Sequence, residues 1–133
     1  MDGFAASWVV DKALDGNVVM YDGIYGQDPP DLTDQLIYMV DFSYKPDVIL
    51  ELAKNNRIVV IDHHKTARAA LSDLNDPNVD VHFDMEHSGA VLAWKYFFPG
   101  EPIPRLIKHV EDRDLWKFEM YGTREINSAL FSY

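Results

Sequence analysis

The sequence predicts an α/β domain: a mostly parallel β-sheet flanked by helices, in a Rossmann-like three-layer arrangement. Short apolar runs of strand length alternate along the chain with segments of helical periodicity. Two of these runs are continuously apolar, which is typical of strands buried on both faces of a parallel sheet. We therefore expect a single domain over 1–133, with right-handed crossovers between its strands.

The first third of the chain contains a helix pattern, a short apolar run and a loop. Apolar residues gather on one side of the segment 3–14, which predicts a helix ending at the turn signal Asp15-Gly16. The apolar run 17–21 predicts a short strand. The Gly, Pro and Asp residues of 23–35 predict a loop.

The two continuous apolar runs, 36–40 and 57–61, predict neighbouring buried strands. Between them, the segment 46–55 begins with a proline, which fits the first turn of a helix. The two strands are followed directly by Asp41 and Asp62. Ligands of open parallel sheets bind at the carboxyl ends of strands, so these two residues indicate a site.

The rest of the chain continues the alternation of helices and strands. Alternating apolar residues predict one more strand, and helical periodicity predicts the other segments, of which one is stopped by Pro99-Gly100. The expected elements are a helix over 66–74, a strand over 79–83, a helix over 88–98, a helix over 104–110 that can reach 116, and a helix over 123–131.

Composition excludes several classes of protein. The 133 residues include no cysteine, which excludes disulfides, thiolate zinc sites and cysteine nucleophiles. The sequence has no apolar stretch of membrane-spanning length and no secretory signal pattern. We therefore expect a cytoplasmic protein with no membrane partner.

The charge balance is strongly acidic. Twelve Lys and Arg stand against twenty-two Asp and Glu, giving a net charge of −10. Such a surface repels a phosphate backbone, so extended double-stranded nucleic acid is not an expected partner. Bound metal cations reverse the local charge, so the acidity is compatible with metal-assisted phosphate chemistry.

The triplet Asp62-His63-His64 carries the strongest chemical signal. It combines a carboxylate with two imidazoles at a strand end, a mixture that suits Mn²⁺, Zn²⁺, Fe²⁺ or Co²⁺ better than Ca²⁺. Adjacent residues point in different directions, so one histidine can bind metal while the other faces a substrate. The alternative is an ordinary polar loop. For Asp41, the alternative is a turn residue or the N-cap of the following helix.

Two further aspartates are weaker candidates. Asp2 precedes a helix, where it could simply cap the helix N-terminus. Asp112 lies in the charged cluster Glu111-Asp112-Arg113-Asp114, which could be a solvated helix face.

Taken together, these pieces resemble the DHH phosphoesterase superfamily, which includes RecJ-type exonucleases, nanoRNA and pAp phosphatases and family II pyrophosphatases. The resemblance covers nearly the whole chain in the family's order. Its five pieces are Asp2-Gly3-Phe4-Ala5-Ala6, Val40-Asp41-Phe42-Ser43-Tyr44, Asp62-His63-His64-Lys65-Thr66-Ala67, Ser88-Gly89-Ala90 and Glu111-Asp112-Arg113-Asp114-Leu115-Trp116.

The resemblance implies four metal ligands: Asp2, Asp41, His63 and Asp112. Asp41 matches the aspartate of the second motif, which bridges two metal ions in the family. Asp114 is the runner-up for the role of Asp112.

The resemblance also implies roles around the substrate phosphate. Asp62 would orient and polarise the site, and His64 would contact the phosphate. Lys65, Arg113 and Ser88 are further candidates for phosphate contacts. For the two basic residues, solvated surface charge is the alternative; for Ser88, it is an ordinary helix cap.

The implied activity is metal-dependent hydrolysis of a phosphate ester of a nucleotide or short oligonucleotide. The implied cofactor is Mn²⁺, at one or two ions per chain, with Mg²⁺, Co²⁺ and Zn²⁺ as alternatives. A second hypothesis is a degenerate domain that binds metal or nucleotide without turnover, and a third is a purely structural module.

The sequence departs from the family pattern at both ends. Family members begin with a buried strand before the first motif and carry a smaller C-terminal substrate domain. We expect this chain to be a shortened form that lacks both. Whether a homodimer completes the cleft is left open by the sequence.

Overall fold

The computed structural model describes residues 1–115, which form five helices and three of the four predicted strands. The three strands form one parallel sheet in the order β1-β2-β3. They are β1 (Leu36–Val40), β2 (Arg57–Asp62) and β3 (Val79–Phe83). The predicted helix over 123–131 lies outside the described residues.

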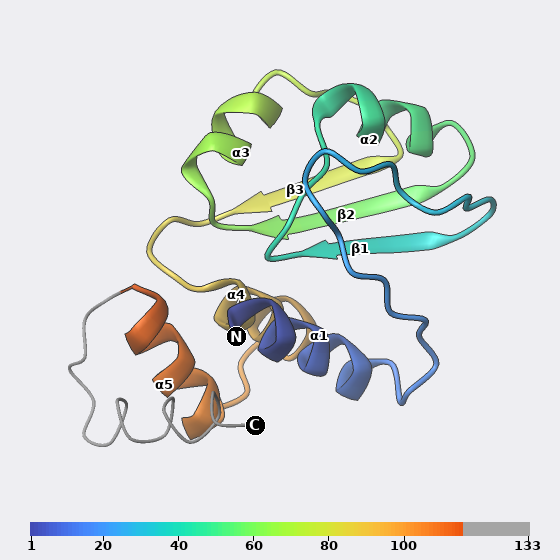
Figure 1. Ribbon diagram of the computed structural model, residues 1–133. Helices are drawn as coiled ribbons and strands as arrows, with labels where there is room; N and C mark the ends of the chain where they lie inside the picture. Colours follow the sequence, from blue (N-terminus) through green and yellow to red (C-terminus); the bar gives the residue numbers. More distant parts are fainter. Residues whose placement is uncertain (116–133) are drawn as a thin grey trace.

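Helices cover the sheet in two layers (Figure 1). Helices α2 and α3 lie over one face, and α1 and α4 lie over the other, with α5 beside them. The helices are α1 (Asp2–Ala13), α2 (Pro46–Ala53), α3 (Lys65–Leu71), α4 (Gly89–Phe97) and α5 (Arg105–Asp114). The predicted α/β fold with a parallel sheet is confirmed.

Strand β2 is the central strand of this sheet, and its position accounts for its continuously apolar sequence. Its residues Ile58 to Asp62 are all buried, because helices cover both faces and strands flank both edges. In β1, by contrast, only Met39 is fully buried and Leu36 is half exposed. The predicted burial on both faces is therefore confirmed for β2 and only partly met by β1, which is an outer strand of the described sheet.

The core consists of two clusters, one on each face of the sheet. The cluster on the α1 and α4 face contains Ala6, Val9, Ala90, Val91, Ala93, Trp94 and Ile107. The cluster on the α2 and α3 face contains Met39, Ile49, Ala53, Ile58, Val60 and Leu71. Burial of these side chains is the main favourable term that holds the two helical layers on the sheet.

The strand predicted over 17–21 is wrong. This segment runs as irregular chain, and Val19, Met20 and Tyr21 are about half exposed or more. An apolar run forms a strand only where another strand pairs with its backbone, and none of the three described strands pairs with this segment.

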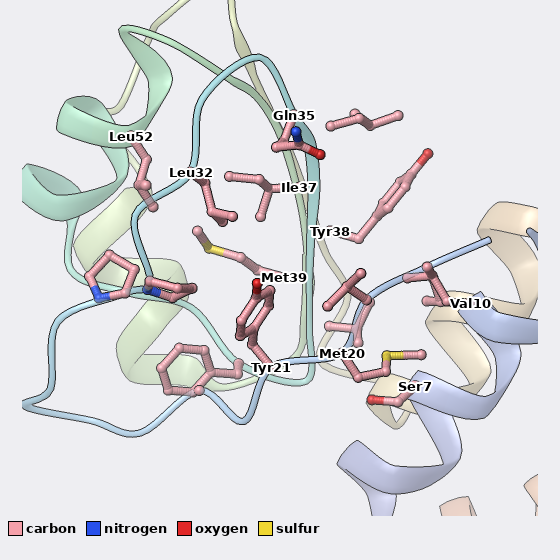
Figure 2. A pocket seen from close by; sticks show the side chains of 18 of the residues that line it. Ser7, Val10, Met20, Tyr21, Leu32, Gln35, Ile37, Tyr38, Met39 and Leu52 are labelled. Carbon is pink, nitrogen blue, oxygen red and sulfur yellow. The ribbon is translucent and has the colours of Figure 1, made fainter. Parts of the chain in front are cut away.

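The segment instead borders a cavity of about 750 Å³ along the outer edge of β1. All five residues of β1 line it, from both faces of the strand, together with residues of α1 and of the 17–35 connection (Figure 2). An edge strand left open in this way presents unpaired backbone groups to the cavity.

No helix within residues 1–115 is long and apolar enough to cross a membrane.

The core packing yields a direct test with a matched pair of residues on α2. Ile49 is fully buried, whereas Leu50, its neighbour, is 41% exposed. We expect Ile49→Ala to lower the free energy of unfolding by about 2–5 kcal/mol, because it leaves a cavity in the core. Leu50→Ala should cost less than about 1 kcal/mol. Urea denaturation measures both, and equal losses would contradict this assignment of the core.

Candidate metal centre

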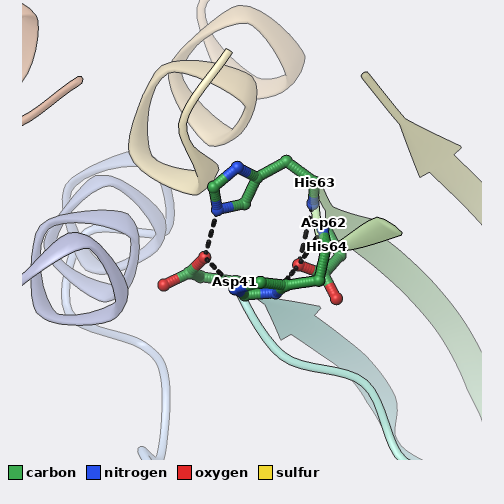
Figure 3. Close-up of side chains that lie close together, drawn as sticks. All are labelled: Asp41, Asp62, His63 and His64. Atoms are coloured by element: carbon green, nitrogen blue, oxygen red, sulfur yellow. Dashed lines mark hydrogen bonds and ion pairs between the residues drawn. The ribbon is translucent and has the colours of Figure 1, made fainter. Parts of the chain in front are cut away.

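Four of the predicted site residues lie at the carboxyl ends of β1 and β2. Asp41 follows β1 directly, and Asp62 ends β2, so the parallel register brings the two strand ends side by side. Figure 3 shows Asp41, Asp62, His63 and His64 gathered at this edge. The position agrees with the rule that open parallel sheets bind ligands at this end.

Asp41 leaves β1 in an uncommon backbone conformation. Its φ angle is 55°, in the left-handed region that few residues other than glycine adopt, although aspartate and asparagine tolerate it best. Its N–H still donates to the carbonyl of Ile61 at 2.9 Å. The chain therefore turns sharply at Asp41 while staying tied to β2, and the carboxylate reaches His63 (Figure 3).

Three carboxylates from three different elements converge on one ring nitrogen. His63 Nε2 lies 3.0 Å from Asp41 Oδ1, 3.3 Å from Asp2 Oδ2 and 3.5 Å from Asp114 Oδ2. Helix α1 supplies Asp2, the end of β1 supplies Asp41, and the end of α5 supplies Asp114. We call these four residues the His63 cluster.

Asp2 also ties α1 to α4. Its two carboxylate oxygens accept hydrogen bonds from the N–H groups of Gly89 and Ala90, each at 2.8 Å. These are the first residues of α4, where N–H groups lack partners within the helix and the helix dipole favours a negative charge. The sequence offered Asp2, as an alternative, as the N-cap of α1. In the structure, Asp2 instead accepts hydrogen bonds from the free N–H groups at the N-terminus of α4.

Gly89 is required for the close approach of α4 to Asp41. A Cβ atom at this position would lie 2.6 Å from Asp41 Cβ and 2.8 Å from Asp41 Oδ1, closer than side chains pack. Only glycine therefore lets the helix N-terminus sit against the carboxylate.

Ser88 is the N-cap of α4, which was the alternative to a phosphate contact in the sequence analysis. Its side chain accepts a hydrogen bond from Val91 N at 3.2 Å, and the residue is fully buried. The N–H groups of Gly89 and Ala90 already donate to Asp2. The N–H groups that would hold a phosphate at this helix start are therefore in use, and the phosphate contact at Ser88 stays a prediction.

Asp62 is buried and orients the two histidines. Its Oδ1 accepts from His63 N at 2.8 Å and lies 2.6 Å from His64 Nδ1, while Ser43 Oγ donates to Oδ2 at 3.5 Å. The two rings lie side by side, with centroids 4.6 Å apart, and share Asp41: its Oδ1 lies 3.0 Å from His63 Nε2 and 3.9 Å from His64 Nε2 (Figure 3). They differ in their other partners, because His63 also meets Asp2 and Asp114, whereas the half-exposed His64 is held by Asp62.

The structure favours Asp114 over Asp112 as the aspartate of α5. Asp114 lies beside His63, and the potential metal-binding groups within residues 1–115 include Asp114 but not Asp112. Asp112 is buried on the same helix. Residues two positions apart on a helix face different sides, and Asp114 is the one whose carboxylate lies 3.5 Å from His63 Nε2.

The two basic residues predicted to contact phosphate lie near the cluster in sequence. Lys65 is exposed at the start of α3, directly after His64. Arg113 is half-buried on α5, next to Asp114. Their phosphate contacts stay predictions.

The cluster shifts the pKa values of its members in a consistent way. Hydrogen bonds to Asp2 and Asp41 raise the pKa of His63 to about 10, so the ring is a cation at neutral pH. Burial raises the pKa of Asp2, but the hydrogen bonds from His63, Ala90 and Gly89 outweigh it and leave the pKa below its ordinary value. Asp41 lacks such backbone donors from α4, and burial with the nearby charge of Asp2 leaves its pKa raised.

Asp114 completes this pattern. Burial and the charge of Asp2 raise the pKa of Asp114 to about 6. The cluster therefore concentrates more negative charge than His63 alone can balance, which is the electrostatic condition that favours a divalent cation.

The donor set fits a divalent transition metal. Ligand atoms bound to one ion at about 2.0–2.2 Å lie at most about 4.4 Å from one another. The distances from His63 Nε2 to the three carboxylates are 3.0–3.5 Å. Asp2, His63 and Asp114 offer ligand atoms that all lie within 4.8 Å of one another, and Asp41 does so with Asp62, His63 and His64. His63 is common to both groups, and carboxylate oxygens with imidazole nitrogen suit Mn²⁺, Co²⁺ or Zn²⁺.

Two residues that shape the site were not singled out from the sequence. Gly89 was part of a helix-start motif, and the signal that marks it is a glycine directly after a serine cap. Glu111 accepts from Ser88 N at 2.8 Å and lies 3.2 Å from His87 Nδ1, which fixes α5 beside the start of α4. No sequence pattern indicated this second contact.

Comparison with known proteins gives a similar viral protein whose own function is uncharacterized. The chain is 42% identical over 90 residues, 67% of its length, to an uncharacterized protein of Acanthamoeba polyphaga mimivirus. The matched part is 21% of that protein, so the chain spans about a fifth of its relative's length. No protein-family model and no solved structure matches the chain.

The raised pKa of His63 predicts how stability of the metal-free protein depends on pH. An ordinary histidine titrates near 6.5 and this one at about 10, so its stabilising contribution is complete below about pH 6.5 and is lost as the pH rises through 10. The raised pKa of Asp114 favours its protonated form in the folded protein. Its contribution to stability is therefore also lost as the pH rises, in this case through about 6.

We expect the free energy of unfolding, measured with urea in the presence of a chelator, to fall between about pH 7 and pH 10. His63→Gln removes the titrating ring and should flatten this dependence. A wild-type profile that stays level over the same range would contradict the cationic state of His63.

Gly89→Ala is predicted to damage the cluster, because its Cβ would displace Asp41. We expect it to lower the free energy of unfolding by about 1–3 kcal/mol and to weaken Mn²⁺ binding. Gly3→Ala is the matched control, since its Cβ would meet only Asp41 Oδ2, at 3.4 Å. Calorimetric titration and urea denaturation compare the two variants, and equal effects would contradict the close approach at Gly89.

Proposed function

We propose that this chain is a DHH-type phosphoesterase domain that uses a divalent metal, Mn²⁺ above all, to hydrolyse a phosphate ester of a nucleotide or short oligonucleotide. The observation that carries the proposal is the convergence of Asp2, Asp41 and Asp114 on His63 at the carboxyl edge of a parallel sheet. The order of the motifs along the chain, with the resemblance they bear to the family, supports it.

The His63 cluster would hold the ion: Asp2, His63 and Asp114 offer ligand atoms within 4.8 Å of one another, and Asp41 Oδ1 lies 3.0 Å from the same ring nitrogen. Bound there, a divalent metal activates water and stabilises charge on the leaving oxygen of a phosphoester. Asp41 turns its carboxylate into the cluster through its left-handed backbone, and Asp2 is held by the N-terminus of α4. The ligands are therefore in place before metal binds, which lowers the cost of ordering them.

His64 would meet the substrate. Its side chain is 42% exposed, Asp62 holds Nδ1 at 2.6 Å, and Nε2 lies 3.9 Å from Asp41 Oδ1, beyond hydrogen-bond distance. In its protonated form, the ring donates from both nitrogens, so Nε2–H would donate to a phosphate oxygen while Nδ1–H stays on Asp62. A donor fixed in this way stabilises charge that develops on the phosphate.

The geometry supports one ion more strongly than two. The other group of potential ligands contains Asp41, Asp62, His63 and His64, and it shares His63 with the first. In it, Asp62 is fully buried, and its Oδ1 is already shared by the backbone of His63 and the ring of His64. This favours a role in orientation, and it is also the observation that favours the second candidate function, a domain that binds metal without turnover.

Calorimetric titration of Mn²⁺ into the metal-free protein tests the proposal first. We expect about one ion per chain, lost in Asp41→Asn, which keeps the backbone conformation because asparagine also tolerates the left-handed region. Asp73→Asn, an exposed aspartate on the protein surface, is the matched control and should bind as the wild type does. Absence of binding by the wild type would overturn the proposal.

Hydrolysis of a 5′-phosphorylated dinucleotide in the presence of Mn²⁺ then separates the two candidates. An enzyme should lose turnover in His63→Ala and should lose about 10–100-fold in Asp62→Asn, since Asp62 acts through the histidines. Metal binding with no turnover by the wild type would support the binding domain and contradict the enzyme.

A further inference from the structure

Three aromatic side chains form a continuous group beside the His63 cluster. The ring centroids of Tyr25 and Phe42 are 4.6 Å apart, and those of Phe42 and Tyr44 are 4.9 Å apart. We call Tyr25, Phe42 and Tyr44 the aromatic ledge. Because Phe42 follows Asp41 directly, the ledge begins one residue away from a member of the His63 cluster.

The loop that carries Tyr25 is held against the ledge by close packing. A Cβ atom at Gly23 would lie 2.6 Å from the ring of Phe42, so only glycine allows the chain to pass this closely. In Figure 1 the connection between α1 and β1 crosses near the segment that leaves β1, and the contact between Gly23 and Phe42 places the two segments side by side. Tyr25 therefore has a defined position above the carboxyl end of β1.

Tyr25 is the exposed end of the ledge. Its residue surface is 67% exposed, whereas Phe42 and Tyr44 are half-buried beneath the loop. Its contact with Phe42, the residue after Asp41, keeps the ring near the site. Partial burial and the charges of Asp62 and Asp41 raise the pKa of its hydroxyl. An exposed aromatic ring backed by a second ring offers a flat apolar surface to a ligand.

The acidic character of the protein explains why such a surface is useful. The net charge is −10, so the protein surface as a whole repels a nucleotide's phosphate. Attraction at the phosphate is then confined to the metal and the few basic or imidazole donors around it. A base that stacks on an aromatic ring adds affinity that does not depend on charge.

We propose that Tyr25, supported by Phe42, is a stacking subsite for the base of a nucleotide whose phosphate lies at the His63 cluster. The inference rests on the proposed function, because it needs a phosphate site at the cluster. It goes beyond that function by assigning recognition of the base to a loop between α1 and β1. Stacking tolerates any base, so the subsite would discriminate nucleotides from phosphates that lack a base rather than one base from another.

Two ligands that differ only in the base test this proposal. AMP and ribose 5-phosphate carry the same sugar and phosphate, and each is titrated calorimetrically into the Mn²⁺-loaded wild-type protein. We expect AMP to bind about tenfold more tightly than ribose 5-phosphate. Because the readout is equilibrium binding, it does not depend on turnover.

Three variants locate the effect. Tyr25→Ala should remove the preference for AMP and leave the affinity for ribose 5-phosphate unchanged, whereas Tyr25→Phe should keep the preference because the ring remains. Tyr21→Ala is the matched control. Tyr21 is also an exposed tyrosine of the same connection. It lines the cavity beside β1, as Phe42 and Tyr44 do, whereas Tyr25 is not among the lining residues, so loss of Tyr21 should leave both affinities as in the wild type.

The outcomes separate failure of the subsite from failure of the proposed function. Equal affinities for the two ligands in the wild type, or a preference that survives Tyr25→Ala, would overturn the stacking subsite while leaving the metal-dependent phosphate site intact. A wild-type protein that binds neither ligand would overturn both proposals.

Discussion

The attraction between His63 and the carboxylates around it is the interaction on which the site depends. Three negatively charged groups brought within 3.5 Å of one nitrogen repel one another, and they stay together only while a cation lies among them. In the metal-free protein, protonated His63 is that cation, with a pKa of about 10. A divalent ion is the stronger counter-charge, so metal binding and release of the His63 proton are coupled.

The fold meets this constraint by using elements that are far apart in sequence. Asp2 reaches across to the N–H groups of Gly89 and Ala90, 87 and 88 residues later, and so joins α1 to α4 on one face of the sheet. Gly89 leaves room for Asp41 at the end of β1. The acidic cluster is thus braced by the same contacts that pack the helical layer, and a loss of packing there would also open the site.

Periodicity in the sequence was enough to place the strands and the residues that end them. Continuous apolar runs marked β1 and β2, so the positions of Asp41 and of the histidine triplet followed directly. The choice between Asp112 and Asp114 did not follow, because it depends on the rotation of α5 about its axis. The strand expected over 17–21 failed for a related reason: apolar residues show strand propensity but not whether a pairing strand exists.

Direct observation of the His63 ring nitrogens tests the account most closely. In long-range ¹H–¹⁵N spectra of the metal-free protein near neutral pH, His63 is predicted to show the signature of a doubly protonated ring. Addition of diamagnetic Zn²⁺ should convert it to a ring bound through Nε2, with loss of that proton. A neutral His63 without metal, or a ring whose nitrogen shifts do not respond to Zn²⁺, would contradict the claim that the cluster is a cation site.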